Sequence, residues 1–429
     1  MIRLVLALLL LAVPAGSQAQ EIAAAESADR LAGRAADAVA VLRGERPPEE
    51  VFTPTFLAAV PADRLAAMSR DMNAQFGAMT GVESVTPGAN PGSAVIVLRF
   101  ERALADGEMQ LEANEPQRIA GLLITNFRLI ADTAQRTQAD LAALPGETAI
   151  YLAPLDGGEP LLSHNADQQL AIGSTFKLYV LSSLARSIRE GRHRWDEVVR
   201  LGEKSFPSGE LQGWPDGAPL TLQTLATLMI SISDNTATDQ LIRLLGREAV
   251  EAEIAAAGHA KPRGNTPLLT TREMFALKAP SRAGLAADFQ AGDTAVRRSV
   301  LERLAPEEVS LAEVNAALAA GPRLLGIEWF ASTLDLTAVL RRLRDLGDPV
   351  VMDILSVEPA ASQAERARWA YIGYKGGSEP GVLNFTWLLR SRTGDWYALA
   401  MSWNIPEAAL DQTTFELLAR RAMALVPGG

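Results

Sequence analysis

The segment from Leu170 to Ile188, LAIGSTFKLYVLSSLARSI, puts a lysine inside an otherwise apolar helix. Lys177 stands three residues after Ser174, and residues three apart share one face of a helix. We therefore expect the Ser174 hydroxyl and the Lys177 amine to be neighbours. Burial among apolar side chains lowers the pKa of a lysine. A neutral amine at this place could take the proton of the serine and turn a weak nucleophile into an effective one.

Lysine is rare in this chain, which favours a chemical role for Lys177. The chain has 40 basic residues, and all but five of them are arginines. Arginine stays protonated, whereas a desolvated lysine can lose its proton. A lysine in a chain that otherwise uses arginine is therefore a candidate base. Its position in the sequence must decide whether it has this role or occurs by chance. The five are Lys177, Lys204, Lys261, Lys278 and Lys375.

The composition excludes several classes of function. A net charge of −11 argues against nucleic acid or an anionic membrane surface as the main partner. The chain has no cysteine, which excludes disulfides, a cysteine nucleophile, a thiolate metal site and a lipid-modified N-terminal cysteine. Three scattered histidines give poor support to a zinc site or a serine–histidine pair. We therefore expect no metal and no cofactor.

The first 19 residues have the pattern of a cleavable signal peptide. Arg3 precedes an apolar run from Leu4 to Val13, and Ser17 and Ala19 fit the −3 and −1 positions of a cleavage site. The run is too short for a comfortable membrane span, and no later stretch of about 18 apolar residues follows. The sequence predicts an exported protein, periplasmic or secreted, without a membrane anchor in its mature form.

A small α+β domain is predicted over residues 25–130. Helical patterns over 23–42 and 62–76 precede four strand-like runs, at 82–85, 93–104, 108–113 and 118–129, with ADGE at 105–108 as a hairpin turn. This order resembles the cone-shaped NTF2-like domains. The resemblance implies a domain for binding or packing rather than for catalysis.

A second domain is predicted over residues 131–429. Strand patterns at 149–155 and 161–164 precede the Ser174 helix, and three more close the chain at 369–374, 382–390 and 396–403. A helix-rich middle runs from about 196 to 355, and helices are predicted at 135–144 and 406–425. Strands that flank a helical insertion indicate an α/β sheet layer with an all-α subdomain.

Three short motifs follow in chain order within this second domain. They are STFK at 174–177, SDN at 233–235 after an apolar helix, and KGG at 375–377, where one predicted strand ends and enters a turn. Their order and context resemble the penicillin-recognising Ser-x-x-Lys hydrolases, most closely the class A β-lactamases. The resemblance covers about residues 131–427. It implies a five-stranded antiparallel sheet flanked by helices, with an all-α subdomain.

The resemblance assigns the chemistry of acyl transfer to the three motifs. Ser174 would be the nucleophile, and Lys177 its base or proton shuttle. Ser233 would relay a proton to the leaving amine. Asn235 would hold the acyl-amide side chain of a substrate, and Lys375 would lie near Ser233 and a substrate carboxylate.

The third motif also supplies the expected oxyanion hole. The backbone N–H groups of Ser174 and Ser378 would hold the oxyanion. Gly376 and Gly377 would let the substrate backbone come close to the edge strand. The family more often has Lys-Thr-Gly or Lys-Ser-Gly here, so a hydroxyl for the substrate carboxylate is missing, and Ser378 could replace it.

Two further residues are candidates with open alternatives. The family carries a glutamate in an Ω-loop as deacylation base, but its pattern is absent, and Glu273 is the nearest carboxylate. TTRE at 270–273 also has the pattern of a capping box before an apolar helix, which would give Glu273 a structural role. Trp214, in GELQGWPDG at 209–217, is either a wall of the active-site cleft or a surface packing residue.

The sequence thus predicts an exported serine hydrolase that forms an acyl-enzyme on Ser174 and takes a small-molecule substrate, a β-lactam or a related amide or ester, with slow deacylation. A D,D-peptidase or an esterase on the same fold is the first alternative, because the two-domain order is also similar to that of a β-lactamase-like protein of clavulanic acid biosynthesis that behaves as an esterase. The second alternative is a binding protein with a vestigial site. An intact set of Ser174, Lys177, Ser233 and Lys375 argues against the second alternative.

Overall fold

The computed structural model describes residues 15–130, 133–305, 307, 310–321 and 324–428. The chain divides into two compact units, Met1–Ala131 and Asp132–Gly429. Most of the predicted signal peptide, residues 1–14, lies outside the described residues. None of the described helices is both long enough and apolar enough to cross a membrane.

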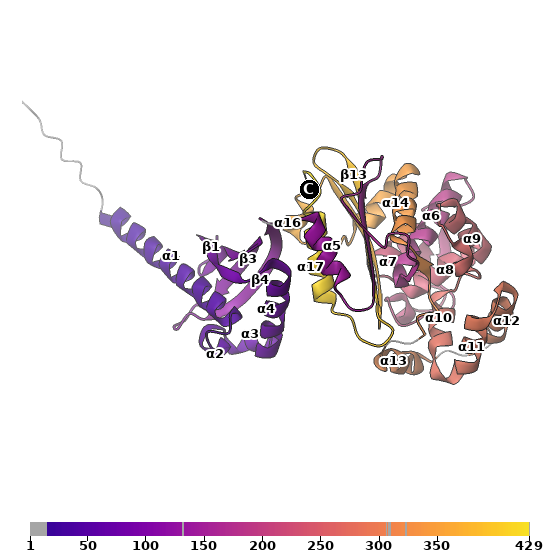
Figure 1. Ribbon diagram of the computed structural model, residues 1–429, viewed down its shortest axis with the longest axis horizontal. Helices are drawn as coiled ribbons and strands as arrows, with labels where there is room; N and C mark the ends of the chain where they lie inside the picture. The colour runs from indigo at the N-terminus through magenta and orange to yellow at the C-terminus, as the bar shows by residue number, and fades with distance from the viewer. Residues whose placement is uncertain (1–14, 131–132, 306, 308–309, 322–323, 429) are drawn as a thin grey trace, which may run out of the picture. The chain divides into compact units, whose positions relative to one another are not determined.

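The first unit is an antiparallel four-stranded sheet with helices before it in the chain (Figure 1). Phe76 and Phe100 are buried in its core, and the half-buried ring of Phe127 stacks on Phe76 with centroids 4.3 Å apart. The strands pair in the order β1-β2-β3-β4. Its elements are α1 (Ala15–Leu42), α2 (Pro48–Val51), α3 (Pro54–Ala59), α4 (Ala62–Phe76), β1 (Met79–Pro87), β2 (Ser93–Phe100), β3 (Ala103–Leu111) and β4 (Ile119–Leu129).

The prediction for the first unit is confirmed for the helix at 62–76 and wrong for one turn. ADGE at 105–108 lies inside β3 and not in a hairpin, because the chain already turns between β2 and β3. Asp106 carries an ion pair with Arg128 of β4, and Gly107 lies at an irregularity of the β3–β4 register. A glycine inside a strand often marks such a bulge. The Asp-Gly pair therefore signals a bulge here.

The second unit is built on an antiparallel five-stranded sheet with the order β11-β12-β13-β5-β6. The strands are β5 (Glu147–Pro154), β6 (Leu162–His164), β11 (Tyr371–Glu379), β12 (Val382–Arg390) and β13 (Trp396–Asn404). The prediction of strand 382–390 is confirmed. In β12 and β13 almost every residue is buried, as expected for central strands covered on both faces.

Two helical layers cover the faces of this sheet (Figure 1). On one face, α5 (Ala134–Ala142) and α17 (Gln412–Met423) pack on aromatic side chains of the sheet, and Phe415 of α17 contacts Phe385 and Trp403. On the other face lies the larger core, which contains α6 and the helices of the subdomain. These are α6 (Lys177–Arg189), α7 (Leu222–Ser231), α8 (Asn235–Leu245), α9 (Arg247–Ala256), α10 (Thr271–Lys278), α11 (Ala283–Ala291), α12 (Thr294–Leu304), α14 (Thr333–Asp345) and α15 (Pro349–Ser356). Helix α13 (Leu311–Ala319) contacts α10, whereas α16 (Gln363–Arg366) lies on the first face, where its Glu365 pairs with Arg420 of α17.

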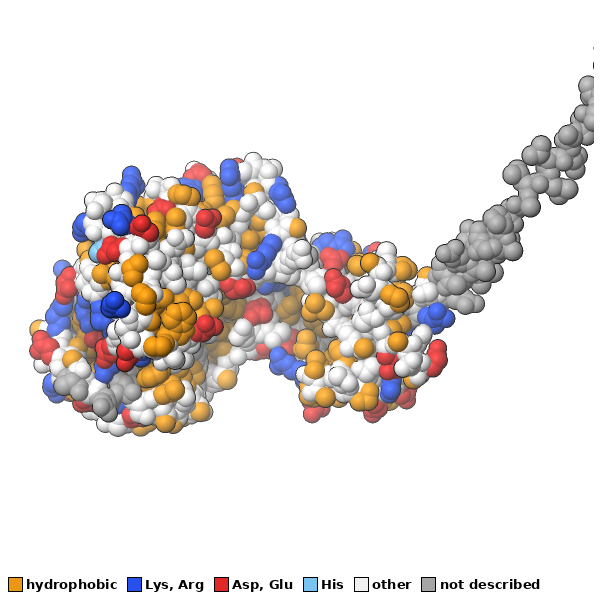
Figure 2. Space-filling view, turned by 180° about the vertical axis from the view of Figure 1, so that it is seen from behind, with side chains coloured by type: hydrophobic (Ala, Val, Ile, Leu, Met, Phe, Trp, Pro, Cys, Tyr) orange, Lys and Arg blue, Asp and Glu red, His pale blue; other side chains and the backbone are white. Residues whose placement is uncertain are grey.

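Short strands and 3₁₀ turns complete the second unit. Strands β7 (Leu170–Ala171) and β10 (Phe330–Ala331) pair with each other, as do β8 (Val198–Arg200) and β9 (Pro219–Thr221). The 3₁₀ turns are η1 (Gly173–Phe176), η2 (Leu211–Gly213), η3 (Pro262–Asn265) and η4 (Pro280–Arg282). On the face drawn in Figure 2, acidic and basic side chains are interspersed over the surface.

Candidate active site

Ser174 lies in the 3₁₀ turn η1, which leads directly into α6. Packing on both sides fixes this turn. The ring of Phe176 stacks on Trp329 with centroids 3.7 Å apart, and the backbone N–H of Ile172 donates to the Trp329 carbonyl at 3.0 Å. Gly173 has φ +49°, a conformation that a side chain would strain. The nucleophile candidate therefore stands on a rigid turn, itself only half-buried.

Lys177 is the first residue of α6 and is fully buried. Its Nζ lies 2.7 Å from the Ser233 carbonyl oxygen, 3.0 Å from Ser233 Oγ and 2.7 Å from Asn235 Oδ1. Burial, and then the charge of Lys375, hold the pKa of Lys177 well below its usual range, against the opposing effect of Asp239 and Asp234. A neutral amine donates only two hydrogen bonds, so the Ser233 hydroxyl can donate the third.

Ser233 is held in a strained backbone conformation. Its φ is +58°, which is uncommon for a residue with a side chain and costs about 1–3 kcal/mol. The next residue, Asp234, holds this conformation in place through its hydrogen bonds. Asp234 is buried, caps α8 through the Ala237 N–H at 2.8 Å, and accepts from the backbone N–H groups of Glu210 and Leu211 at 2.7 and 2.9 Å. Strain that the surroundings hold in place is typical of functional sites.

Lys375, on a strand of the sheet, contacts the hydroxyl of Ser233 as well. It lies on the edge strand β11, where it is 4 % exposed, and its Nζ is 3.2 Å from Ser233 Oγ and 2.6 Å from the Gly376 carbonyl oxygen. Burial lowers the pKa of Lys375 to about 7. The structure thus brings Lys177, Ser233 and Lys375 together in one chain of hydrogen bonds.

The expectation that KGG at 375–377 enters a turn is wrong, because β11 continues to Glu379. Gly376 and Gly377 pair with Phe385 and Asn384 of β12, so the ladder extends through both glycines. A Cβ on Gly377 would lie 2.0 Å from the Ile172 carbonyl oxygen and 2.7 Å from the Ser174 nitrogen. The glycine is therefore required for β11 to approach the Ser174 turn.

The two expected oxyanion-hole donors lie where β11 comes close to the Ser174 turn, one on each segment. A Cβ on Gly173 would be 3.3 Å from the Ser378 nitrogen, so the Ser174 and Ser378 segments run against each other. The Ser378 side chain is exposed.

Asn235 lies beside the lysine and is 2 % exposed. Its Oδ1 accepts from Lys177, and its Nδ2 donates to the Phe206 carbonyl at 3.1 Å. Both ends of the amide thus already have protein partners. The contacts of Asn235 fix the position of the Lys177 amine, in addition to the substrate-binding role that the resemblance implies.

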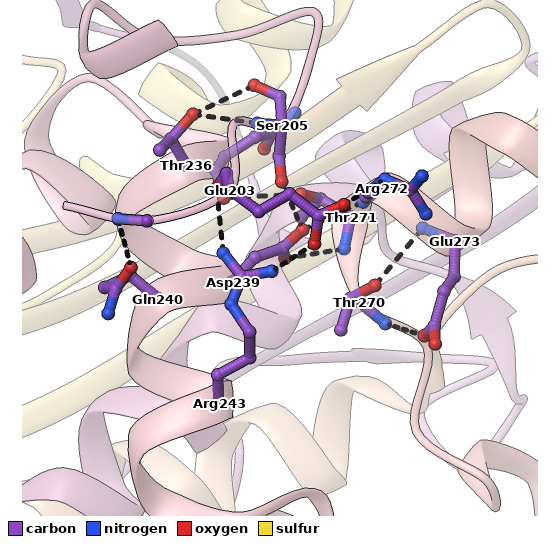
Figure 3. Close-up of polar contacts among 12 residues, drawn as sticks. Glu203, Ser205, Thr236, Asp239, Gln240, Arg243, Thr270, Thr271, Arg272 and Glu273 are labelled. Carbon is purple, nitrogen blue, oxygen red and sulfur yellow. Dashed lines mark hydrogen bonds and ion pairs between the residues drawn. The ribbon is translucent and has the colours of Figure 1, made fainter. Parts of the chain in front are cut away.

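Glu273 lies in a different set of contacts, shown in Figure 3. It forms the capping box of α10 with Thr270, as the sequence pattern indicates, and pairs with Arg247 at 2.7 Å. Buried Asp239 of α8 fixes the same helix start by accepting from the N–H groups of Thr271 and Arg272 at 2.7 and 2.9 Å. The partners that the structure gives to Glu273 thus lie at the starts of α9 and α10, outside the hydrogen-bonded set of Lys177, Ser233 and Lys375.

Trp214 lies on a pinned surface loop and is 43 % exposed. Lys204 holds the loop by donating to the carbonyl oxygens of Leu211 and Trp214 at 3.2 and 2.6 Å. Asp234 holds its start through Glu210 and Leu211. The indole is thus free to contact other molecules.

The sequence analysis missed Asp234 as an organiser of the site. Its signal was available, because Asp234 stands between two candidate residues and before a helix, where aspartate is a preferred cap. In the described part of the chain, no three histidine or acidic side chains are grouped to hold a metal ion. The arrangement offers Ser174 as a candidate nucleophile, the desolvated amine of Lys177, the bridging hydroxyl of Ser233, the second buried amine of Lys375 and two candidate backbone donors, which are parts that acyl transfer could use.

Comparisons with solved structures give distant likenesses. A β-lactamase from Sphaerobacter thermophilus DSM 20745 is 20 % identical, with a TM-score of 0.48 over 68 % of this chain and 94 % of its own. A point mutant of PBP-A, solved as an acyl-enzyme complex with penicillin G, is 19 % identical, with a TM-score of 0.47 over 68 % of this chain and 93 % of its own. L2, solved in complex with relebactam, is 17 % identical, with a TM-score of 0.46 over 69 % and 94 %.

No curated protein matches the chain. A protein family does match part of it, and this part contains Ser174, Lys177 and Ser233, while Lys375 lies beyond it. Residues 132–306 of this chain match the family described as the beta-lactamase enzyme family.

Proposed function

We propose that this protein is an exported serine hydrolase that forms an acyl-enzyme on Ser174. Its substrates are β-lactams or related amides or esters. The observation that carries the proposal is the buried Lys177 amine, 3.0 Å from Ser233 Oγ, with Lys375 on the same oxygen. The match of residues 132–306 to the beta-lactamase enzyme family supports it. Export rests on the pattern of residues 1–19.

Acylation would proceed in two steps. In the first, Ser174 Oγ attacks the carbonyl carbon, a C–O bond forms, and the hydroxyl proton passes to the neutral Lys177 amine. The developing oxyanion lies between the N–H groups of Ser174 and Ser378. In the second step the C–N or C–O bond breaks, and the leaving group takes a proton through Ser233. The acyl ester on Ser174 remains, and water must then hydrolyse it.

A D,D-peptidase or esterase on the same site is the second candidate, and the contacts of Glu273 favour it. A carboxylate engaged in a helix cap and an ion pair is not positioned as a base for deacylating water. Slow release of a penicillin is therefore expected even where the natural ester or amide turns over. The first unit, predicted to be NTF2-like, would then serve binding or packing.

Intact-mass measurement after mixing with a penicillin, followed over time, tests the proposal. The expected result is a mass increase equal to one penicillin, located on Ser174 by peptide mapping and absent from Ser174→Ala. A binding protein with a vestigial site would show no covalent adduct. An adduct on Ser163, Ser205 or Ser378 would assign the nucleophile elsewhere.

A further inference from the structure

Beside the Ser174 turn, three charged side chains are buried together. Lys278 ends α10, Glu328 lies in the segment before β10, and Glu379 ends β11. Their side chains are 6 %, 0 % and 6 % exposed. Lys278 Nζ lies 3.1 Å from Glu328 Oε1 and forms a second, shorter ion pair with Glu379. We call these three residues the Lys278 cluster.

The Lys278 cluster has two carboxyls for one amine, so one bound proton would make it neutral. Among the described residues, Glu379 Oε2 is buried without a hydrogen-bond partner. Burial and then the neighbouring Glu328 raise the pKa of Glu379 well above its usual range, while Lys278 opposes this. A proton shared between the two carboxyls would supply the missing donor and leave the cluster neutral.

The main electrostatic effects on the pKa values of Lys278 and Glu379 come from within the cluster. The hollow lined by Lys278 and Glu379 is otherwise formed by apolar residues and a glycine, several of them from α13. These are Phe275, Val314, Ala317, Leu318, Gly321 and Pro380. In such surroundings an unpaired charge is costly, so each member of the cluster depends on the other two.

Glu328 connects the Lys278 cluster to the Ser174 turn through Trp329. Glu328 Oε2 accepts from the backbone N–H of Trp329 at 3.0 Å. Trp329 in turn stacks on Phe176 and accepts from the Ile172 N–H. Glu328 therefore fixes the residue against which the Ser174 turn is packed.

Glu379 connects the Lys278 cluster to β11, the strand that carries the Ser378 N–H and that we call the oxyanion strand. Side chains alternate along a strand, so Lys375, Gly377 and Glu379 share one face of β11. Lys375 reaches Ser233 and Gly377 lies against the Ser174 nitrogen, while Glu379, the last paired residue of the strand, reaches Lys278. Glu379 directly follows Ser378 and anchors the end of an edge strand that has a partner strand on one side only.

We propose that the Lys278 cluster positions the oxyanion hole, by holding the Ser378 N–H of β11 and the Ser174 turn at a fixed separation through one shared proton. The inference rests on the proposed function. Lys278, Glu328 and Glu379 are positioning residues in it and do not touch the substrate. A donor displaced by about 1 Å can cost 10²-fold in rate, so loss of the cluster should reduce acylation by about 10- to 100-fold.

The test measures the acylation rate constant of the full chain with a fluorescent penicillin from pH 6 to pH 10. Lys278→Met leaves the two carboxyls without their cation and should acylate about 10- to 100-fold more slowly, with substrate affinity changed less than the rate. Glu379→Gln, which cannot ionise, should remove a decline that wild type shows at alkaline pH as the shared proton is lost. The double variant Lys278→Met/Glu379→Gln should recover part of the rate lost in Lys278→Met.

A second buried ion cluster provides the matched control. Buried Glu253 of α9 pairs with Arg342 of α14 and Arg186 of α6, outside the oxyanion strand. Arg342→Met should lower the melting temperature, as Lys278→Met does, but leave the acylation rate and its pH profile unchanged. Equal rate losses in Arg342→Met and Lys278→Met at equal losses of stability would overturn the positioning role.

The outcome also separates this inference from the proposed function. If wild type forms no adduct with penicillin, the proposed function fails. If wild type is acylated but Lys278→Met matches its rate, or Glu379→Gln keeps the wild-type pH profile, the positioning role alone fails. Glu379→Gln preserves side-chain shape, so it keeps the proposal testable should Lys278→Met fail to fold.

Discussion

Lys177 and Lys375 meet on a single oxygen: their ammonium nitrogens lie 3.0 and 3.2 Å from Ser233 Oγ. Two positive charges so close together in a buried site repel each other, and burial disfavours both. Below about pH 7, where Lys375 binds a proton, the arrangement therefore favours one neutral and one charged amine. Lys177 is the better candidate for the neutral amine, because the charge of Lys375 is a cause of its lowered pKa.

Lys177→Arg should reduce acylation by penicillin by about 10²-fold or more, the size of a lost general base. Arginine keeps the positive charge but cannot become a neutral base. The rate is measured by stopped-flow fluorescence with a labelled penicillin. Lys261→Arg, at an exposed lysine, is the matched control and should behave as wild type. Near-normal acylation in Lys177→Arg would remove the proton-transfer role of Lys177.

Gly377→Ala should abolish rapid acylation although it adds only a methyl group. The new Cβ would lie 2.0 Å from the Ile172 carbonyl oxygen, so β11 must move away from the Ser174 turn and take the Ser378 N–H with it. Loss of one oxyanion donor costs about 10²- to 10³-fold in rate. Gly284→Ala is the control, because no atom lies within 4 Å of the corresponding Cβ. Equal acylation rates in the two variants would show that the oxyanion donors lie elsewhere.

The charge of Lys375 should make stability depend on pH. The pKa of Lys375 is about 7 in the fold and 10.5 for a free lysine side chain, so the unfolded chain binds more protons between these values. The stability that this group contributes is fully present above pH 10.5 and is lost as the pH falls through about 7. Compared with Lys375→Met, wild type should gain up to about 1.4 kcal/mol in free energy of unfolding per pH unit between pH 7 and pH 10.

Urea unfolding of both proteins at several pH values measures this difference. Lys261→Met, at an exposed lysine, serves as the control and should differ from wild type by a constant amount across the same range. If the curves for wild type and Lys375→Met run parallel, the amine of Lys375 titrates normally, and its buried contacts have been misjudged.

The sequence predicted those parts of the site that lie close together in the chain or have a strong local pattern. The STFK spacing, the apolar helix before SDN and the capping box at Thr270–Glu273 are local, and the structure contains them. The extent of β11 was wrong because two glycines were interpreted as a turn, whereas pairing with β12 and the approach of the Ser174 turn require them in a strand. Nothing local could show that Lys278, Glu328 and Glu379 meet, because 50 residues separate the first two and 101 separate the first and third.

Residues 132–429 should fold and react with penicillin without the first unit. The two units are separately compact, and every residue of the proposed acylation site belongs to the second. Expression of this fragment, a thermal melt and labelling by fluorescent penicillin test the prediction. A folded fragment that does not label would mean that the first unit contributes to catalysis.

Deacylation should be slow, because the proposed site has the parts for acylation, but in the described part of the chain no carboxylate hydrogen-bonds Lys177, Ser233 or Lys375. Without a base for the attacking water, hydrolysis of the acyl ester falls by about 10²- to 10⁴-fold. A penicillin adduct should therefore persist for minutes or longer, seen by mass spectrometry as a burst of one equivalent followed by slow turnover. Glu273→Gln keeps a side-chain oxygen for the capping box of α10 but removes the charge that pairs with Arg247. Thr270→Ala removes the capping side chain and should lower stability by about 0.5–2 kcal/mol. Neither variant should lengthen the life of the adduct. Wild-type turnover on the order of hundreds per second, together with an adduct trapped by Glu273→Gln and not by Thr270→Ala, would instead make Glu273 the deacylation base.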